Sequence, residues 1–118
     1  MFKIGYYTWY NLTIENNVSH DEEVKAAKAL AEITGFISPE KIEESYSRPF
    51  GFISYDSMKW YDWESDMDQL ARAFPDIVFC LWGEGEERDD NWRCYFHGED
   101  KELQHGTINY APRPVWSY

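Results

Sequence analysis

The stretch from Trp60 to Phe96 constrains the fold most, because it reads as a helix, a strand, an acidic turn and a second strand. Asp62 is a favourable N-cap for the helix, and Pro75 ends it. Apolar side chains recur between them at the spacing of one helix face: Trp63, Met67, Leu70 and Phe74. Residues 77–82 are an unbroken apolar run, typical of an inner strand that is buried on both faces. We therefore expect the helix stripe to pack on this strand.

The two strands that flank the acidic turn are expected to form a hairpin with its tip at residues 86–88. The predicted pairs are Trp82–Trp92, Cys80–Cys94 and Val78–Phe96 on one face, with Phe79–Tyr95 and Leu81–Arg93 on the other. Cross-strand aromatic pairs of this kind stabilise hairpins. The two cysteines match neither a zinc site nor a disulfide framework, so we interpret them as a reduced cross-strand pair in the core.

The remaining segments add further strands and helices. Residues 2–14 are rich in β-branched and aromatic side chains and predict a first strand. Ser19 and Glu22 form a capping box for a helix that ends at Gly35. Three more elements are expected: a short helix over 38–46, a strand over 50–61 and, after a turn at 98–101, a last strand over 102–110.

This order of elements favours a single α+β domain that spans residues 1–118. Helices should cover one face of a largely antiparallel sheet of four or five strands, giving a two-layer sandwich. The length suits one hydrophobic core, and no linker or repeat divides the chain. No stretch has the length and apolar character of a membrane span or a signal peptide, so we expect a cytoplasmic protein without a membrane partner.

The net charge of −11 comes from 22 acidic and 11 basic residues. This charge argues against direct binding of nucleic-acid phosphates or anionic membranes. It is consistent with simple solubility, or with a basic protein partner that itself binds nucleic acid. The aromatic share of 19% either fills a small core or supplies anchors on a binding face. A monomer and a homodimer both remain open.

Two acidic groups, at the start of the central helix and on the turn after the strand, are the candidate partner-binding residues. The helix should run antiparallel to that strand, which brings both groups to one end of the domain with an aromatic anchor beside them. The candidates are Asp62, Glu64, Asp66, Asp68, Glu84, Glu86, Glu87, Asp89 and Asp90, with Trp60 and Tyr61 as anchors. A third group, Glu40, Glu43 and Glu44, would help such carboxylates imitate the phosphate charge of a duplex. Solvation alone is the competing interpretation of each group.

No pattern in the sequence predicts a catalytic site. The three histidines, His20, His97 and His105, are scattered and match no zinc or nucleophile–base spacing. We expect no enzymatic activity, no cofactor and no metal. The alternative is a metal-dependent hydrolase that uses Glu84, Glu86 and Asp90, because carboxylates on a turn can hold a hard cation.

Residues 74–96, with 60–62, are similar to a sequence core of small acidic proteins from phages, plasmids and other mobile elements. The shared pattern is carried by Trp60-Tyr61-Asp62, Phe74-Pro75-Asp76, Gly83 to Glu87, Asp89 or Asp90, Trp92 and Tyr95-Phe96. The resemblance implies a ferredoxin-like α+β fold. By analogy of size, charge and origin, it implies an inhibitor of a nucleic-acid-binding host defence complex, of the anti-CRISPR type and acting as a nucleic-acid mimic in the host cytoplasm. A phage or plasmid adaptor without an inhibitory role is the alternative.

Overall fold

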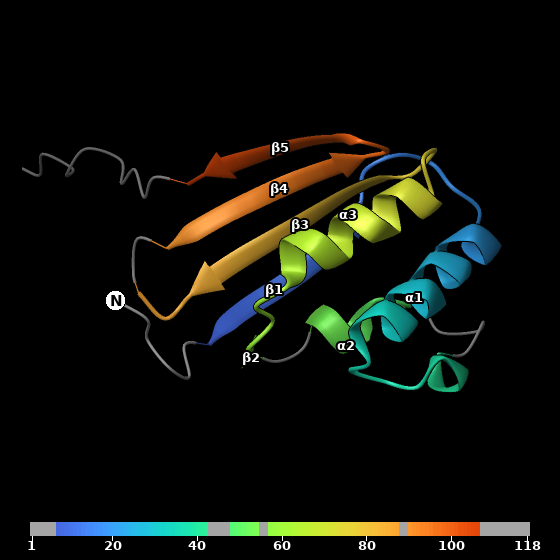
Figure 1. Ribbon diagram of the computed structural model, residues 1–118, viewed down its shortest axis with the longest axis horizontal. Helices are drawn as coiled ribbons and strands as arrows, with labels where there is room; N and C mark the ends of the chain where they lie inside the picture. The colour runs from blue at the N-terminus through green and yellow to red at the C-terminus, as the bar shows by residue number, and fades with distance from the viewer. Residues whose placement is uncertain (1–6, 43–47, 55–56, 88–89, 107–118) are drawn as a thin grey trace, which may run out of the picture.

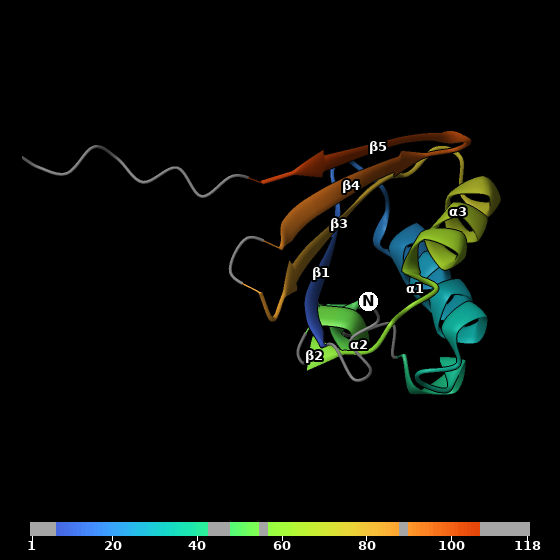
Figure 2. The ribbon, with the colours of Figure 1, turned by 60° about the vertical axis from the view of Figure 1, so that its left-hand side comes forward.

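The computed structural model describes residues 7–42, 48–54, 57–87 and 90–106, and it shows an antiparallel sheet in the order β2-β1-β3-β4-β5 (Figure 1). The strands are β1 (Thr8–Ile14), β2 (Ser57–Met58), β3 (Val78–Gly85), β4 (Asn91–His97) and β5 (Asp100–His105). The helices are α1 (His20–Thr34), the 3-10 turn η1 (Pro39–Lys41), α2 (Gly51–Ser54) and α3 (Trp63–Ala73). Helices α1 and α3 lie side by side on one face of the sheet (Figure 2). The predicted two-layer α+β sandwich is confirmed.

Local capping signals place the ends of α1 where the sequence predicts them. The Ser19 hydroxyl accepts a hydrogen bond from the backbone N–H of Glu22 at 3.1 Å. Gly35 ends the helix with a φ of 71°, a left-handed conformation that favours glycine. Helix α3 also begins directly after Asp62, although the Asp62 side chain makes no capping hydrogen bond. The N-cap position in α3 is therefore correct, but the capping interaction is not formed.

The β4–β5 connection is a tight hairpin turn. His97 pairs with Asp100, which leaves two residues in the loop, and Gly98 has a φ of 60°. A positive φ at the first loop residue matches the right-handed twist of hairpin strands. Strand β5 consequently begins earlier than predicted, at Asp100, and ends at His105. The part of the predicted strand beyond residue 106 lies outside the described residues, as do residues 2–6 of the predicted first strand.

The strand predicted over 50–61 is wrong for most of its length. Helix α2 occupies its first part, and among the described residues of this segment only Ser57–Met58 pairs with β1. Phe50 and Ile53 are both buried, and a helical turn places residues three apart on one side, whereas a strand would send them to opposite faces. The helix predicted over 38–46 is only the 3-10 turn Pro39–Lys41 among the described residues, and residues 43–47 lie outside them.

The β3–β4 hairpin differs from the predicted register by one residue. Leu81 pairs with Cys94, Cys80 with Tyr95, and Gly83 with Trp92. The backbone N–H of Gly85 donates to the Asp90 carbonyl at 2.8 Å, so the connection is one residue longer than the predicted tip. A shift of one residue in the register moves the side chains of one strand to the other face of the sheet relative to its partner strand. Cys80 and Cys94 therefore lie on opposite faces as separate buried thiols, and the predicted cross-strand pair is wrong.

The core lies between the helices and the face of the sheet that carries Phe79 and Leu81, both fully buried. Met67 and Leu70 of α3 join this core as predicted. The ring contacts of α3 go to β4, however, because Trp63 stacks on Trp92 with centroids 4.3 Å apart. No helix of the described residues covers the opposite face. On that face Cys80 is buried but Trp82 is 39% exposed, so the predicted burial of β3 on both sides holds only for the first part of the strand.

Candidate interaction surface

The acidic turn after β3 presents its carboxylates to solvent. Glu84, Glu86 and Glu87 are exposed, and Asp90 is half-buried. Glu86 accepts a hydrogen bond from the backbone N–H of Tyr7 at 2.9 Å, which ties the turn to the start of β1. Asp89 lies outside the described residues. The turn therefore offers a set of carboxylates whose position is fixed at the end of two neighbouring strands.

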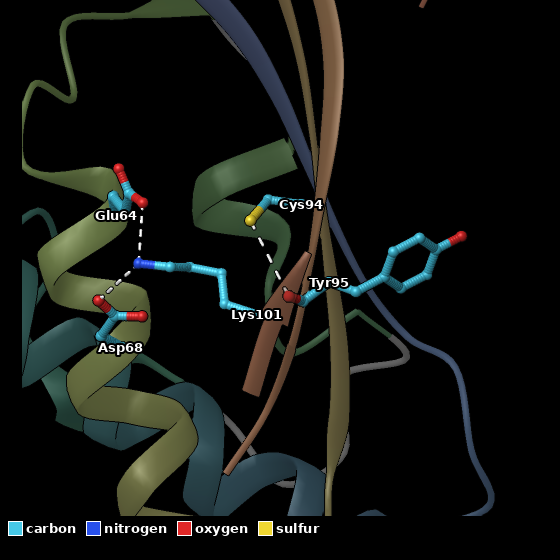
Figure 3. Close-up of polar contacts among 5 residues, drawn as sticks. All are labelled: Glu64, Asp68, Cys94, Tyr95 and Lys101. Carbon is cyan, nitrogen blue, oxygen red and sulfur yellow. Dashed lines mark hydrogen bonds and ion pairs between the residues drawn. The ribbon is translucent and has the colours of Figure 1, made fainter. Parts of the chain in front are cut away.

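The carboxylates of α3 are largely engaged within the fold. Lys101 of β5 forms ion pairs with Glu64 at 2.8 Å and with Asp68 at 3.1 Å (Figure 3). Hydrogen bonds to Glu64 and then to Asp68 hold the pKa of Lys101 above its ordinary value. Asp66 accepts a hydrogen bond from the indole N–H of Trp60 at 2.7 Å. Three of the four predicted helix carboxylates thus have structural partners, and the fourth, Asp62, is exposed.

The predicted aromatic anchor Tyr61 and one carboxylate of the acidic turn lie at the same hollow. Tyr61, at the start of α3, and Asp90, at the end of the turn, line one hollow beside Trp63 and Trp92. Tyr61 is 67% exposed, whereas Trp60 is buried and so presents no ring to a partner. We call this surface the acidic end and define it as Tyr61, Asp62, Glu84, Glu86, Glu87 and Asp90.

The uncovered face of the sheet carries a second set of candidate residues that the sequence reasoning missed. The strand registers place Trp9, Glu84 and Asn91 in one row across β1, β3 and β4. The next row, two residues along each strand, is Asn11, Trp82, Arg93 and Gln104. Trp9 is 50% exposed and Trp82 is 39% exposed. Large aromatic side chains on an open sheet face are candidates for binding.

Arg93 is held in place at the centre of this face. Its guanidinium lies 5.1 Å from the ring centroid of Trp82 and 5.4 Å from that of Tyr95. Its Nε donates to the side-chain oxygen of Gln104 at 2.7 Å, and Gln104 in turn donates to Glu102 at 2.9 Å. The ring and amide contacts together fix the positive charge among aromatic side chains.

A groove of about 580 Å³ runs over these two rows. We call it the open-face groove, and its central lining residues are Trp9, Asn11, Trp82, Glu84, Arg93 and Gln104. Its volume is within the range of ligand-binding clefts. Glu84 belongs both to the groove and to the acidic end, so the two surfaces are continuous. The alternation of Trp9, Asn11 and Thr13 with the buried Tyr10 and Leu12 is the sequence signal for this face.

The two thiols and the possible metal ligands among the described residues bear on catalysis and metal binding. Burial raises the pKa of the Cys80 and Cys94 thiols to about 11, which keeps both protonated and poorly nucleophilic near neutral pH. No three His, Cys, Asp or Glu side chains within the described ranges are placed to hold a metal ion. None of the helices in those ranges has the length and apolar character needed to cross a membrane.

Comparison of this chain with protein-family models, curated proteins and solved structures finds no match. The case for a function therefore depends on the acidic end and the open-face groove.

Proposed function

We propose that this chain is a protein-binding domain, without enzymatic activity, whose acidic end engages a basic surface of a partner protein. The observation that carries the proposal is the meeting of two chain segments at that end. Exposed Tyr61 and half-buried Asp90 line one hollow, and Glu84 and Glu86 lie on the adjoining strand end and turn. An exposed aromatic ring surrounded by carboxylates suits a cationic partner surface.

The electrostatic field of the whole chain supports the same partner class. A net charge of −11 and a local excess of carboxylates raise the rate of encounter with a basic groove. Grooves that bind nucleic acid are basic, so we propose that the partner is a nucleic-acid-binding complex. The resemblance to small mobile-element proteins favours a host defence complex and inhibition of the anti-CRISPR type in the host cytoplasm. An accessory adaptor role is the alternative.

Co-purification of the tagged chain from a host lysate, followed by mass spectrometry, identifies the partner. Its association kinetics are then measured at low and high salt with two double variants. Glu86→Lys with Glu87→Lys reverses charge at the acidic end, and Glu22→Lys with Glu23→Lys makes the same change on α1 as the control. We expect association to slow by about tenfold or more in the first variant and by less than about twofold in the control.

Equal losses in the two double variants, or an affinity unchanged by salt, would show that the acidic end only solvates the protein. The hydrolase alternative is tested by calorimetric titration with magnesium, manganese, calcium and zinc. Micromolar binding of one of these ions that is lost in Glu86→Ala would contradict the non-enzymatic proposal.

A further inference from the structure

We propose that the open-face groove binds a lysine or arginine side chain from an extended segment of the basic partner. The cation lies against Trp9 and Trp82, with Glu84 as its counter-ion. This inference depends on the proposed function, because it names how the same partner is held. It adds a second contact surface, which the acidic turn alone does not provide.

The strand register brings the three groups together. Trp9 of β1 is directly opposite Glu84 of β3, which places their Cβ atoms about 5 Å apart. Trp82 is two residues before Glu84 on the same strand, so its side chain leaves the same face about 7 Å away. All three line the groove. Two aromatic rings and one carboxylate therefore surround a single position on the sheet.

This combination of side chains favours a cation. The face of an indole ring is electronegative, and tryptophan is the strongest of the aromatic side chains for cation–π contact. The protein already shows this contact in its own side chains, since Arg93 lies over Trp82 and Lys59 lies over the ring of Tyr7. No cation of the described residues lies over Trp9, whose side chain is half exposed.

The surrounding charges argue for a protein segment rather than a nucleic acid. Glu84 lies in the groove, Glu86 follows it on the turn, and Glu102 borders it on β5, so phosphates would be repelled. Arg93 is the exception, and its guanidinium is already held by Gln104 and beside the rings of Trp82 on β3 and Tyr95 on β4. The exposed amide of Asn11 provides a donor and an acceptor for the backbone of an extended segment.

The groove has room for this occupant. At about 580 Å³ it is well within the range of clefts that hold drug-sized ligands. The helices α1 and α3 lie on the other side of the sheet (Figure 2). An extended segment can therefore cross the strands while one long side chain lies between Trp9 and Trp82.

The test uses the full chain and two synthetic peptides. The probe is an acetylated and amidated peptide of alternating glycine and arginine, and its counterpart carries citrulline, which has nearly the same shape but no charge. Binding is followed by the tryptophan indole N–H signals in NMR spectra. We expect the arginine peptide to shift the signals of Trp9 and Trp82, and the citrulline peptide to bind at least about tenfold more weakly.

Variants separate the groove from the rest of the acidic surface. Trp9→Leu and Glu84→Gln should each weaken binding of the arginine peptide by about tenfold. Phe36→Leu, at another exposed aromatic ring, and Glu99→Gln, at the far end of β4, should change it by less than about twofold. Urea unfolding of each variant confirms that the sheet remains folded.

Equal binding of the two peptides, or binding unaffected by Trp9→Leu, would overturn the inference. So would a single-stranded oligonucleotide that binds in a Trp9-dependent manner. The identified partner then distinguishes the two proposals. If charge reversal at Glu86 and Glu87 weakens partner binding but Trp9→Leu does not, the groove inference fails and the proposed function stands. If neither change weakens it, both proposals fail.

Discussion

Substitution of Gly83 by alanine should destabilise the sheet, because the ring of Trp92 occupies the space a methyl group would need. A β-carbon at this position would lie 2.2 Å from two ring carbons of Trp92. Ordinary contact begins at 3.4 Å, so the ring would have to move by about 1.2 Å. The same ring stacks on Trp63 at 4.3 Å and meets Tyr10 edge-on at 6.0 Å, so this movement disturbs two further contacts.

The expected loss follows from three contributions. Overpacking of a well-packed site costs about 1–3 kcal/mol. Each disturbed aromatic pair loses up to about 1 kcal/mol. Replacing glycine in a strand by alanine stabilises the folded state by about 0.5–1 kcal/mol, because the unfolded chain has less conformational entropy to lose. We therefore expect Gly83→Ala to lower the free energy of unfolding by about 2–3 kcal/mol, measured by urea denaturation.

A double-mutant cycle tests the cause. In a Trp92→Ala background the obstructing ring is absent, so Gly83→Ala should become neutral or stabilise by about 0.5 kcal/mol. Gly106→Ala is the matched control, because its β-carbon would lie 3.5 Å from Asn91, an ordinary contact. A loss from Gly83→Ala that is the same with and without the Trp92 ring would refute the reasoning.

Two further predictions concern the core and its titratable groups. Leu70→Asp places an unpaired charge at a fully buried position, so it should lower the free energy of unfolding by more than about 4 kcal/mol and abolish the cooperative urea transition. The control Gln69→Asp, on the exposed side of the helix, should lower it by less than about 0.5 kcal/mol. Normal unfolding of the Leu70 variant would contradict the assigned core. Burial raises the pKa of Tyr10 to about 12 and that of the Cys80 and Cys94 thiols to about 11. Because the folded state favours the protonated forms, the contribution of these three groups to stability should be constant below the unfolded thiol value of about 8.5 and should fall as the pH rises towards 12. Urea midpoints measured at increasing pH above this value test the expectation, and midpoints that stay constant would count against the burial of these groups.

The parts of the fold that local chemistry determines could be predicted from sequence. Ser19 and Gly35 specify the ends of α1 through a short-range hydrogen bond and one backbone conformation, and both are observed in these roles. Glu22 takes part through its backbone N–H. The segment Gly51–Ser54 shows the limit, because an apolar run of this length is compatible with a strand or a helical turn. The helical turn allows Ile53 and Phe50 to be buried together, and this burial depends on tertiary packing rather than on the local sequence.

The candidate site was predictable only in part for a similar reason. The grouping of carboxylates near Tyr61 follows from the antiparallel course of α3 and β3, which the sequence indicates. The open-face groove depends on which residues share a face of the sheet. A register that is wrong by one residue assigns the side chains to the wrong faces, so the groove cannot be predicted from it. With the predicted register, Trp82 would have pointed into the core beside Trp92. In the structure Trp92 instead lies over Gly83, and Trp82 points outward.

The pairing of β1 with β3 also bears on how the chain is made. Strands β3, β4 and β5 follow one another directly and can pair as soon as they are synthesised. β1 and α1 are made first, but the long partner of β1 comes only after α3, and its earlier partner β2 contributes two residues. Until then the apolar sides of β1 and α1, including Leu12 and Leu30, have no sheet to cover them. We therefore expect the domain to complete its folding only after β3 has been synthesised, with the nascent β1 and α1 segments depending until then on the ribosome surface or on chaperones to remain soluble.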